Sequence, residues 1–359
     1  MIQNNQAIPF NKENFKQIFS FSFILVIIIS LPSAIIAEFF NIPLAWFLGP
    51  MLITSLASLM GLKIRMPRLI LSSLLILLGL YIGNYIDRSL LMQMHQWLWT
   101  SLIMLIYIIL SVLIVSKYLQ RFSKYEQKTS IFSAAPGALG PLMILAEDEK
   151  TDLSQVATSH LIRLIIIITI FPFIVNSFYD AELTQVAKKA MDNQNLSHLL
   201  ILMLTSIIII YFFDKLKVPA ALLSGTLIAS GFLQITEIAV YKISPNVIDY
   251  CLLILGASVG CRFANKTFSE IGRNALHSFI ATFLLVFLGL SAAFVASLVI
   301  DKNFFSLLLS YCPGGIYEVA VIAIFFELDP EFVSFHHIVR LLMILFIVPI
   351  MLKIISKKT

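Results

Sequence analysis

Long apolar segments fill most of this chain and restrict what it can fold into. A helix needs about 20 predominantly apolar residues to cross the hydrocarbon core of a bilayer, and many stretches meet that requirement. Only 13% of the residues are charged, whereas an ordinary soluble domain has roughly a quarter. A soluble protein this apolar would lack the polar surface that water requires. We therefore predict an all-α polytopic membrane protein.

The apolar segments divide into two halves of six. The first half covers about 19–176 and the second about 198–352, with a polar linker at 177–197. A cytoplasmic N-terminal tail, 1–18, and a basic C-terminal tail, 353–359, flank them. In chain order, the predicted segments are 19–38, 42–61, 69–86, 97–118, 129–147, 156–176, 198–213, 218–236, 246–262, 275–300, 303–327 and 332–352.

The two halves repeat each other in sequence. Ten residues of the first half recur 177 positions later: Ser133, Pro136, Gly137, Ala146, Asp152, Val156, His160, Arg163, Leu164 and Pro172 pair with Ser310, Pro313, Gly314, Ala323, Asp329, Val333, His337, Arg340, Leu341 and Pro349. Chance matches among Leu and Ile are common in apolar chains, but Pro-Gly, Asp, His, Arg and Pro in one frame are not. We interpret the chain as an internal duplication.

These repeated motifs resemble a known family. SAAPGALG…DLSQVATSHLIRL and SYCPGGIYEVA…DPEFVSFHHIVRL, with IPLAWFLGPML upstream, resemble the duplicated bacterial membrane family labelled AbrB, also labelled ammonia monooxygenase. The resemblance runs from about 20 to 352. It implies a multi-pass protein of the bacterial cytoplasmic (inner) membrane, with distant similarity to inverted-repeat secondary transporters. One position departs from the pattern: the acid after Pro-Gly-Gly is present as Glu318, but Pro141 stands in the first repeat.

The distribution of basic residues predicts the topology. If 129–147 and 303–327 crossed the membrane fully, the halves would be parallel, and Arg262, Lys266 and Arg273 would lie outside, against the positive-inside rule. If both segments re-enter on one side, each half crosses five times and the halves are inverted. The basic loops then become cytoplasmic. We therefore favour about 10 spanning helices plus two re-entrant or discontinuous segments, and full crossing remains the alternative.

The two exceptional segments each carry a Pro-Gly sequence near the middle. Pro136-Gly137 and Pro313-Gly314-Gly315 combine a residue without a backbone donor with residues of unusual conformational freedom. Broken backbone at membrane depth is tolerated only inside protein or beside a water-filled cavity. Many transporters bind substrate at such interrupted helices. We predict a substrate or ion site here, and simple kinks are the alternative.

Five ionisable residues are further candidates. Arg163 and Arg340 are predicted to bind substrate or ion. The alternatives are a structural tie to Glu318 or to carbonyls freed by the breaks, or extension of the side chain to the membrane interface. His160 and His337 precede these arginines by three residues on one helix face, and are candidates for proton coupling or for packed, hydrogen-bonded roles. Glu318 is a candidate for binding a cation or proton, or for pairing with one of those arginines.

No enzyme signature is visible. The three cysteines form no CxxC pair, the six histidines are scattered, and no P-loop or HExxH pattern occurs, so we expect no catalytic residue, metal or cofactor. We expect a secondary transporter that moves a small solute, anionic under one hypothesis, by alternating access. A membrane-bound regulator or sensor of gene expression is the alternative, and the oxygenase label is disfavoured. Expected partners are the bilayer and a small solute or ion, not nucleic acid, and homo-oligomer formation stays open.

Overall fold

Helices form every regular element in the described part of the chain. The computed structural model describes residues 12–86, 88–178, 196–239, 241, 246–264 and 266–356. Most of the predicted linker and the outer parts of both predicted tails lie outside these residues. The helices are α1 (Lys12–Ile18), α2 (Phe21–Phe39), α3 (Ala45–Leu59), α4 (Arg68–Gly83), α5 (Arg88–Ser123), α6 (Gln127–Ala134), α7 (Leu139–Asp148), α8 (Leu153–Phe178), α9 (Leu196–Lys215), α10 (Ala221–Thr236), α11 (Asn246–Cys261), α12 (Phe268–Ser297), α13 (Phe304–Tyr311), α14 (Ile316–Phe325) and α15 (Pro330–Ser356).

Every predicted apolar segment contains a helix, and the two segments with Pro-Gly contain two each. Six spans within the described residues are apolar and long enough to cross a membrane; they correspond to α2, α5, α8, α9, α12 and α15. Helices α3, α4, α10, α11 and α14 are apolar but shorter. The all-α prediction is therefore confirmed. A total of about ten crossings would need four of the shorter helices, and that number stays a prediction.

The surface of the long helices is strongly apolar. Large side chains on α2, α9 and α12 are exposed, among them Ile28 at 59%, Leu204 at 61% and Phe287 at 64%. Soluble monomers rarely expose apolar patches of more than a few hundred Å². Long apolar helices with exposed apolar side chains give the architecture of a polytopic membrane protein.

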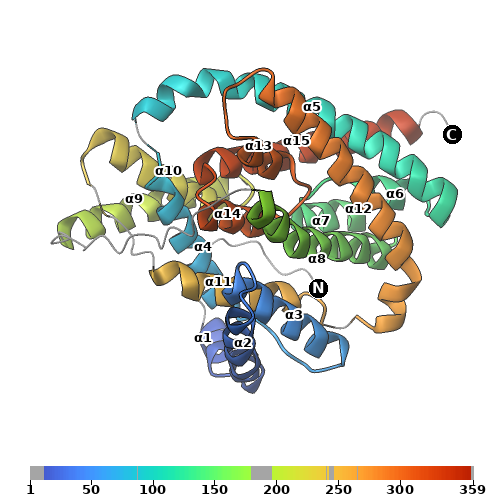
Figure 1. The fold of residues 1–359 in the computed structure, drawn as a ribbon, viewed down its shortest axis with the longest axis horizontal. Coiled ribbons are helices and arrows are strands. Elements are labelled where there is room, and N and C mark those ends of the chain that lie inside the picture. Colours follow the sequence, from blue (N-terminus) through green and yellow to red (C-terminus); the bar gives the residue numbers. More distant parts are fainter. Residues whose placement is uncertain are drawn as a thin grey trace.

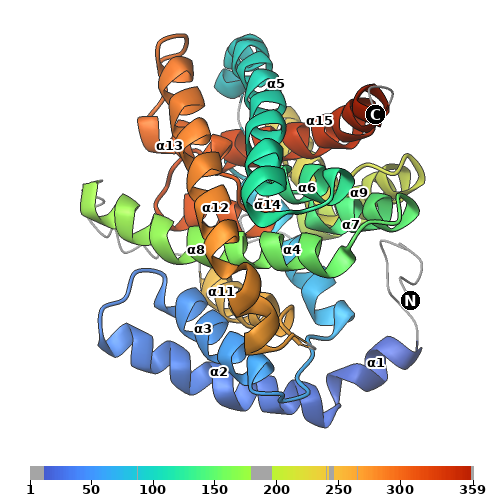
Figure 2. The same cartoon turned by 90° about the vertical axis from the view of Figure 1, so that its right-hand side faces the viewer.

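The helices pack as two bundles. In the first, which we call the paired-helix bundle, α3 packs on α11 and α2, and α10 packs on α4 and α9. In the second, the broken-helix bundle, the long helices α5, α8, α12 and α15 surround the short helices α6, α7, α13 and α14. Figure 1 places α2 and α3 at the lower edge and α5 at the upper edge. Figure 2 shows α12 crossing α8 between them.

Glycines bring the paired helices close together. A Cβ added at Gly256 of α11 would collide with the carbonyl oxygen of Phe47 on α3, and one added at Gly79 of α4 would collide with backbone of α10. A second glycine follows four residues later in both helices, at Gly83 and Gly260. Small residues spaced by four let helix backbones approach within a membrane. This packing holds the first bundle together.

Gly256→Ala is therefore expected to lower the thermal stability of the detergent-purified protein. The added methyl group meets backbone, which cannot rotate away, so the helices must separate; overpacking of this kind costs about 1–3 kcal/mol. Gly272→Ala on α12 is the matched control, because no atom lies within 4 Å of its added Cβ. An equal melting temperature for the two variants would contradict the close approach.

Candidate functional site

Both helix breaks fall on the predicted Pro-Gly positions. The first break separates α6 from α7 and contains Pro136 and Gly137, and the second separates α13 from α14 and contains Pro313, Gly314 and Gly315. Proline has no N–H with which to continue the helix. Gly137 has a φ of 104°, a conformation that strongly favours glycine. The local sequence therefore explains why both helices stop here.

Each broken segment folds back on itself. Lys128 in the first turn of α6 forms an ion pair of 2.6 Å with Glu149, directly after α7. Lys302, before α13, pairs with Asp329, after α14, at 2.7 Å. Helices α6 and α13 have 8 residues each, so each rises only about 12 Å. We call α6 with α7 the first hairpin, and α13 with α14 the second hairpin; the break is the turn of each.

Two histidines replace the donors that the prolines remove. A helical N–H bonds to the carbonyl four residues earlier, so the prolines of the breaks leave the carbonyls of Phe132 and Leu309 without that donor. His160 Nε2 lies 3.0 Å from the Phe132 oxygen, and His337 Nε2 lies 3.0 Å from the Leu309 oxygen. A carbonyl only accepts, so Nε2 carries the hydrogen in both rings. Both predicted proton-coupling candidates thus have a structural hydrogen bond.

Arg163 of α8 holds the first break. Its Nη1 donates to the Ala135 oxygen and its Nη2 to the Ser133 oxygen, each at 2.5 Å. The residue is only 3% exposed, so these charged donors take the place of water at the end of α6, where carbonyls lack helical partners. Arg163 therefore contacts the carbonyls freed by the break, which was one of the roles predicted for it.

Arg340 of α15 holds the second break. Its Nη1 donates to the Cys312 oxygen, and its Nη2 donates to the Gly314 oxygen at 2.7 Å. The same Nη2 lies 3.0 Å from Nδ1 of His337. Because Nε2 of that ring donates and Nδ1 accepts, both nitrogens of His337 are engaged. His337 therefore has a structural partner at each nitrogen, and its role in proton coupling stays a prediction.

The two breaks meet inside the broken-helix bundle. A Cβ added at Gly137 would lie 3.0 Å from Arg340 Nη2 and 3.3 Å from the Gly314 oxygen. The guanidinium group that holds the second break therefore also touches the first. Residues predicted as site candidates in both halves of the chain come together at this point.

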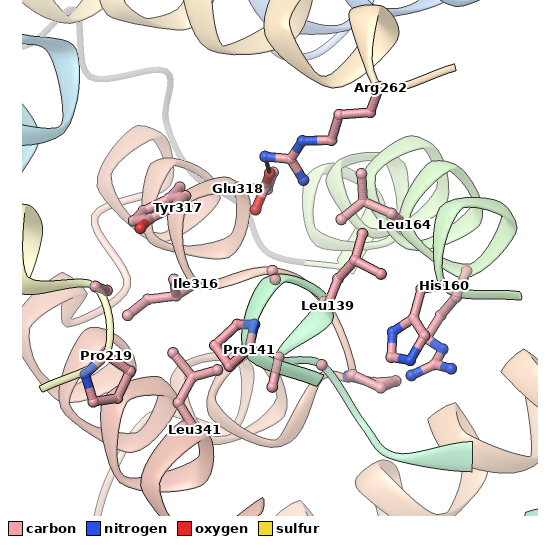
Figure 3. A pocket seen from close by; sticks show the side chains of 18 residues that line it. Leu139, Pro141, His160, Leu164, Pro219, Arg262, Ile316, Tyr317, Glu318 and Leu341 are labelled. Carbon is pink, nitrogen blue, oxygen red and sulfur yellow. Dashed lines mark ion pairs between the residues drawn. The ribbon is translucent and has the colours of Figure 1, made fainter. Parts of the chain in front are cut away.

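A cavity of about 300 Å³ lies beside the meeting point. Both breaks line it, together with His160, Arg163 and Leu164 of α8, Leu341 of α15, and Arg262, which follows α11. Figure 3 shows Leu139, Ile316 and Leu341 below Glu318, and His160 to the right. The volume is at the lower end of the range for small-molecule sites.

Glu318 lines the cavity but pairs with neither of the predicted arginines. Its Oε1 lies 2.8 Å from Nη2 of Arg262, although the geometry is not that of a hydrogen bond. Glu318 is 1% exposed, while the Arg262 side chain is 30% exposed. Because Arg163 and Arg340 are engaged with carbonyls, the expected pairing of Glu318 with one of them is replaced by a pairing with Arg262.

Sequence reasoning assigned Arg262 only to topology. A single arginine at the end of an apolar segment gives no sign of its partner, which lies in another helix. Pro219 and Ala220, before α10, also line the cavity. The available signal was that Val-Pro-Ala-Ala at 218–221 resembles Ile-Pro-Leu-Ala at 42–45 of the first half. Within the described ranges, no group of three or more His, Cys, Asp or Glu residues is placed to hold a metal ion.

Comparison with known proteins identifies the family. The family model described as "Transition state regulatory protein AbrB" matches residues 46–356. The chain belongs to the AbrB family. It is 22% identical over 290 residues to the "Uncharacterized protein YhjN" of Bacillus subtilis, covering 76% of this chain and 75% of that protein. It is 22% identical over 317 residues to the "Putative regulator AbrB" of Escherichia coli, covering 88% and 91%. No solved structure matches this AbrB-family chain.

Arg340→Leu is expected to destabilise the protein strongly. The substitution removes two charged donors from buried carbonyls, and a hydrogen bond to a charged group contributes about 1.5–3 kcal/mol. Thermal unfolding in detergent measures the loss. Arg121→Leu serves as the control, because Arg121 is exposed near the end of α5. If both variants melted at the same temperature, Arg340 would not hold the break.

Proposed function

We propose that this chain is a secondary transporter of a small anionic solute, with the cavity as its binding site. The observation that carries the proposal is the meeting of two broken hairpins at one cavity lined by both breaks. Interrupted helices that meet between two repeats are a common way to build a transporter site. Such helices leave backbone groups free to contact a solute, while neighbouring helices satisfy the rest.

The charges around the cavity favour an anion. Arg163 and Arg262 line it, whereas Glu318 is the acidic residue among the described lining residues. Helices α7 and α14 also begin at the cavity wall, at Leu139 and Ile316. The first turn of a helix has a partial positive charge. The balance of these charges is positive.

Loop contacts support two inverted halves. Ion pairs join the two ends of each hairpin. A third ion pair, of 3.4 Å, joins Arg88, the first residue of α5, to Glu237, which follows α10. If both hairpins crossed fully, the partners in all three pairs would lie on opposite sides of the membrane. In the inverted arrangement each pair lies on one side. The first hairpin then enters from the cytoplasm and the second from outside.

The inverted arrangement also agrees with the basic residues. It places the loops with Lys63, Lys124, Lys215 and Lys266 on one side, which the positive-inside rule makes cytoplasmic. We infer insertion in a bacterial cytoplasmic membrane, with the lipid bilayer around the exposed apolar side chains. The two bundles then provide the parts that alternating access requires: one bundle moves against the other and exposes the cavity to each side in turn.

A regulatory function is the second candidate. It rests on names alone, since the family description contains "regulatory protein" and the Escherichia coli relative is named a regulator. A sensor would bind its signal from one side and act through a partner. The sidedness of access to the cavity therefore separates the two functions.

A cysteine placed in the cavity tests the transport proposal without knowledge of the solute. In a chain whose three native cysteines are replaced, Leu139→Cys is treated with a membrane-impermeant thiol reagent in right-side-out and inside-out vesicles. Alternating access predicts labelling in both preparations, because the same residue is exposed to each side in turn.

Two control positions define the limits of that experiment. Phe287→Cys, on the apolar face of α12, should label in neither preparation, and Lys124→Cys should label only in inside-out vesicles. Labelling of Leu139→Cys from one side only would contradict a transporter and favour a sensor.

A further inference from the structure

The carboxylate of Glu318 is held in an unusual position. One oxygen faces the guanidinium group of Arg262 at 2.8 Å. The other lies so close to Gly315 that an added Cβ there would collide with it. Gly315 is the N-cap of α14 and Glu318 lies in the first turn of that helix. A buried carboxylate thus lies between a guanidinium group and a helix N-terminus at the cavity wall. Figure 3 shows Glu318 beside Arg262.

Holding the breaks does not require this pair. His160, Arg163, His337 and Arg340 supply the donors at both breaks. The position 177 residues before Glu318 is Pro141, so the first hairpin has no equivalent carboxylate and keeps its break. The ion pair between Glu318 and Arg262 is therefore available for another role.

The surroundings of Arg262 suit one carboxylate with an apolar tail. A guanidinium group matches the two oxygens of a carboxylate, and this one is partly exposed. The walls of the cavity that it lines include Leu139, Leu164, Ile316 and Leu341. Arg163 already uses both Nη atoms on carbonyls. One available guanidinium group favours a solute with a single negative charge over a multiply charged anion such as phosphate.

We propose that Arg262 binds the carboxylate of a short aliphatic monocarboxylate, and that Glu318 holds Arg262 until that carboxylate displaces it. The proposal rests on the cavity being the solute site, as proposed above, and names its substrate class. The pair also connects the two bundles, since Arg262 follows α11 and Glu318 belongs to α14. Exchange of Glu318 for the solute therefore breaks a buried ionic contact between bundles that must move apart.

Glu318→Gln tests the competition directly. The amide keeps the shape of the side chain but removes its charge, so a solute carboxylate no longer competes for Arg262. We expect the purified full-length variant to bind butyrate roughly ten- to a hundredfold more tightly than the unsubstituted chain, as removal of one charged interaction predicts. Isothermal titration and the butyrate-dependent rise in melting temperature, at constant ionic strength with chloride, measure the change.

Further variants and ligands identify the binding group. Adding Arg262→Gln to Glu318→Gln should abolish butyrate binding. If that double variant unfolds, Arg262→Lys with Glu318→Gln replaces it and should bind at least several-fold more weakly than Glu318→Gln alone, because the planar fork is lost. Glu149→Gln is the matched control: it removes a surface carboxylate and its ion pair, and should bind butyrate as the unsubstituted chain does.

Three results would overturn the assignment: Glu318→Gln binds butyrate no better than the unsubstituted chain; neutral butyramide binds as well as butyrate; or inorganic phosphate binds more tightly than butyrate. The binding assay needs no membrane, and the vesicle assay needs no solute. Two-sided access without butyrate binding therefore overturns only the carboxylate assignment. Butyrate binding with one-sided access overturns only the transport proposal.

Discussion

Hydrogen bonds from buried histidine and arginine side chains to backbone carbonyls stabilise the two helix breaks at the centre of this protein. Proline removes the N–H that would bond to the carbonyls of Phe132 and Leu309, and a buried histidine donates to each carbonyl instead; the Leu309 oxygen also accepts from the N–H of Cys312. Arginines then satisfy the carbonyls that follow. An unsatisfied backbone group costs several kcal/mol in an apolar medium. Without these side chains, unsatisfied carbonyls would destabilise the broken hairpins within the apolar interior of the molecule.

These hydrogen bonds also determine the geometry of the cavity. Because the arginines hold backbone, they position the two breaks against each other, and Arg340 contacts both. The cavity beside them is bounded by fixed backbone and by apolar side chains. One ion pair, between Arg262 and Glu318, lines the same cavity and takes no part in holding the breaks. It joins the broken-helix bundle to the paired-helix bundle, which is held together separately by glycines such as Gly256.

Much of this arrangement follows from the sequence. The length of the apolar segments predicted the helices, and the Pro-Gly sequences predicted the positions of both breaks. The repeated histidine and arginine residues were predicted as candidates for the functional site. The sequence could not decide between solute contact and carbonyl contact for Arg163, because the donors on a guanidinium group suit both. Arg262 was missed as a partner of Glu318, since 56 positions separate them and only packing between bundles brings them together. Helix α5 starts at Arg88, before the predicted 97, because its first turns are too polar for a hydropathy boundary.

We propose that the two hairpins enter from opposite sides of the membrane and meet at their breaks. Single cysteines at both ends of each hairpin, in a chain without its native cysteines, test it most directly with an impermeant thiol reagent on intact cells and inside-out vesicles. We expect Lys124→Cys and Glu147→Cys to label only from the cytoplasm, and Asp301→Cys and Glu327→Cys only from outside. If the two ends of either hairpin labelled from opposite sides, or both hairpins from the same side, the hairpins would not enter the membrane from opposite sides and meet at their breaks.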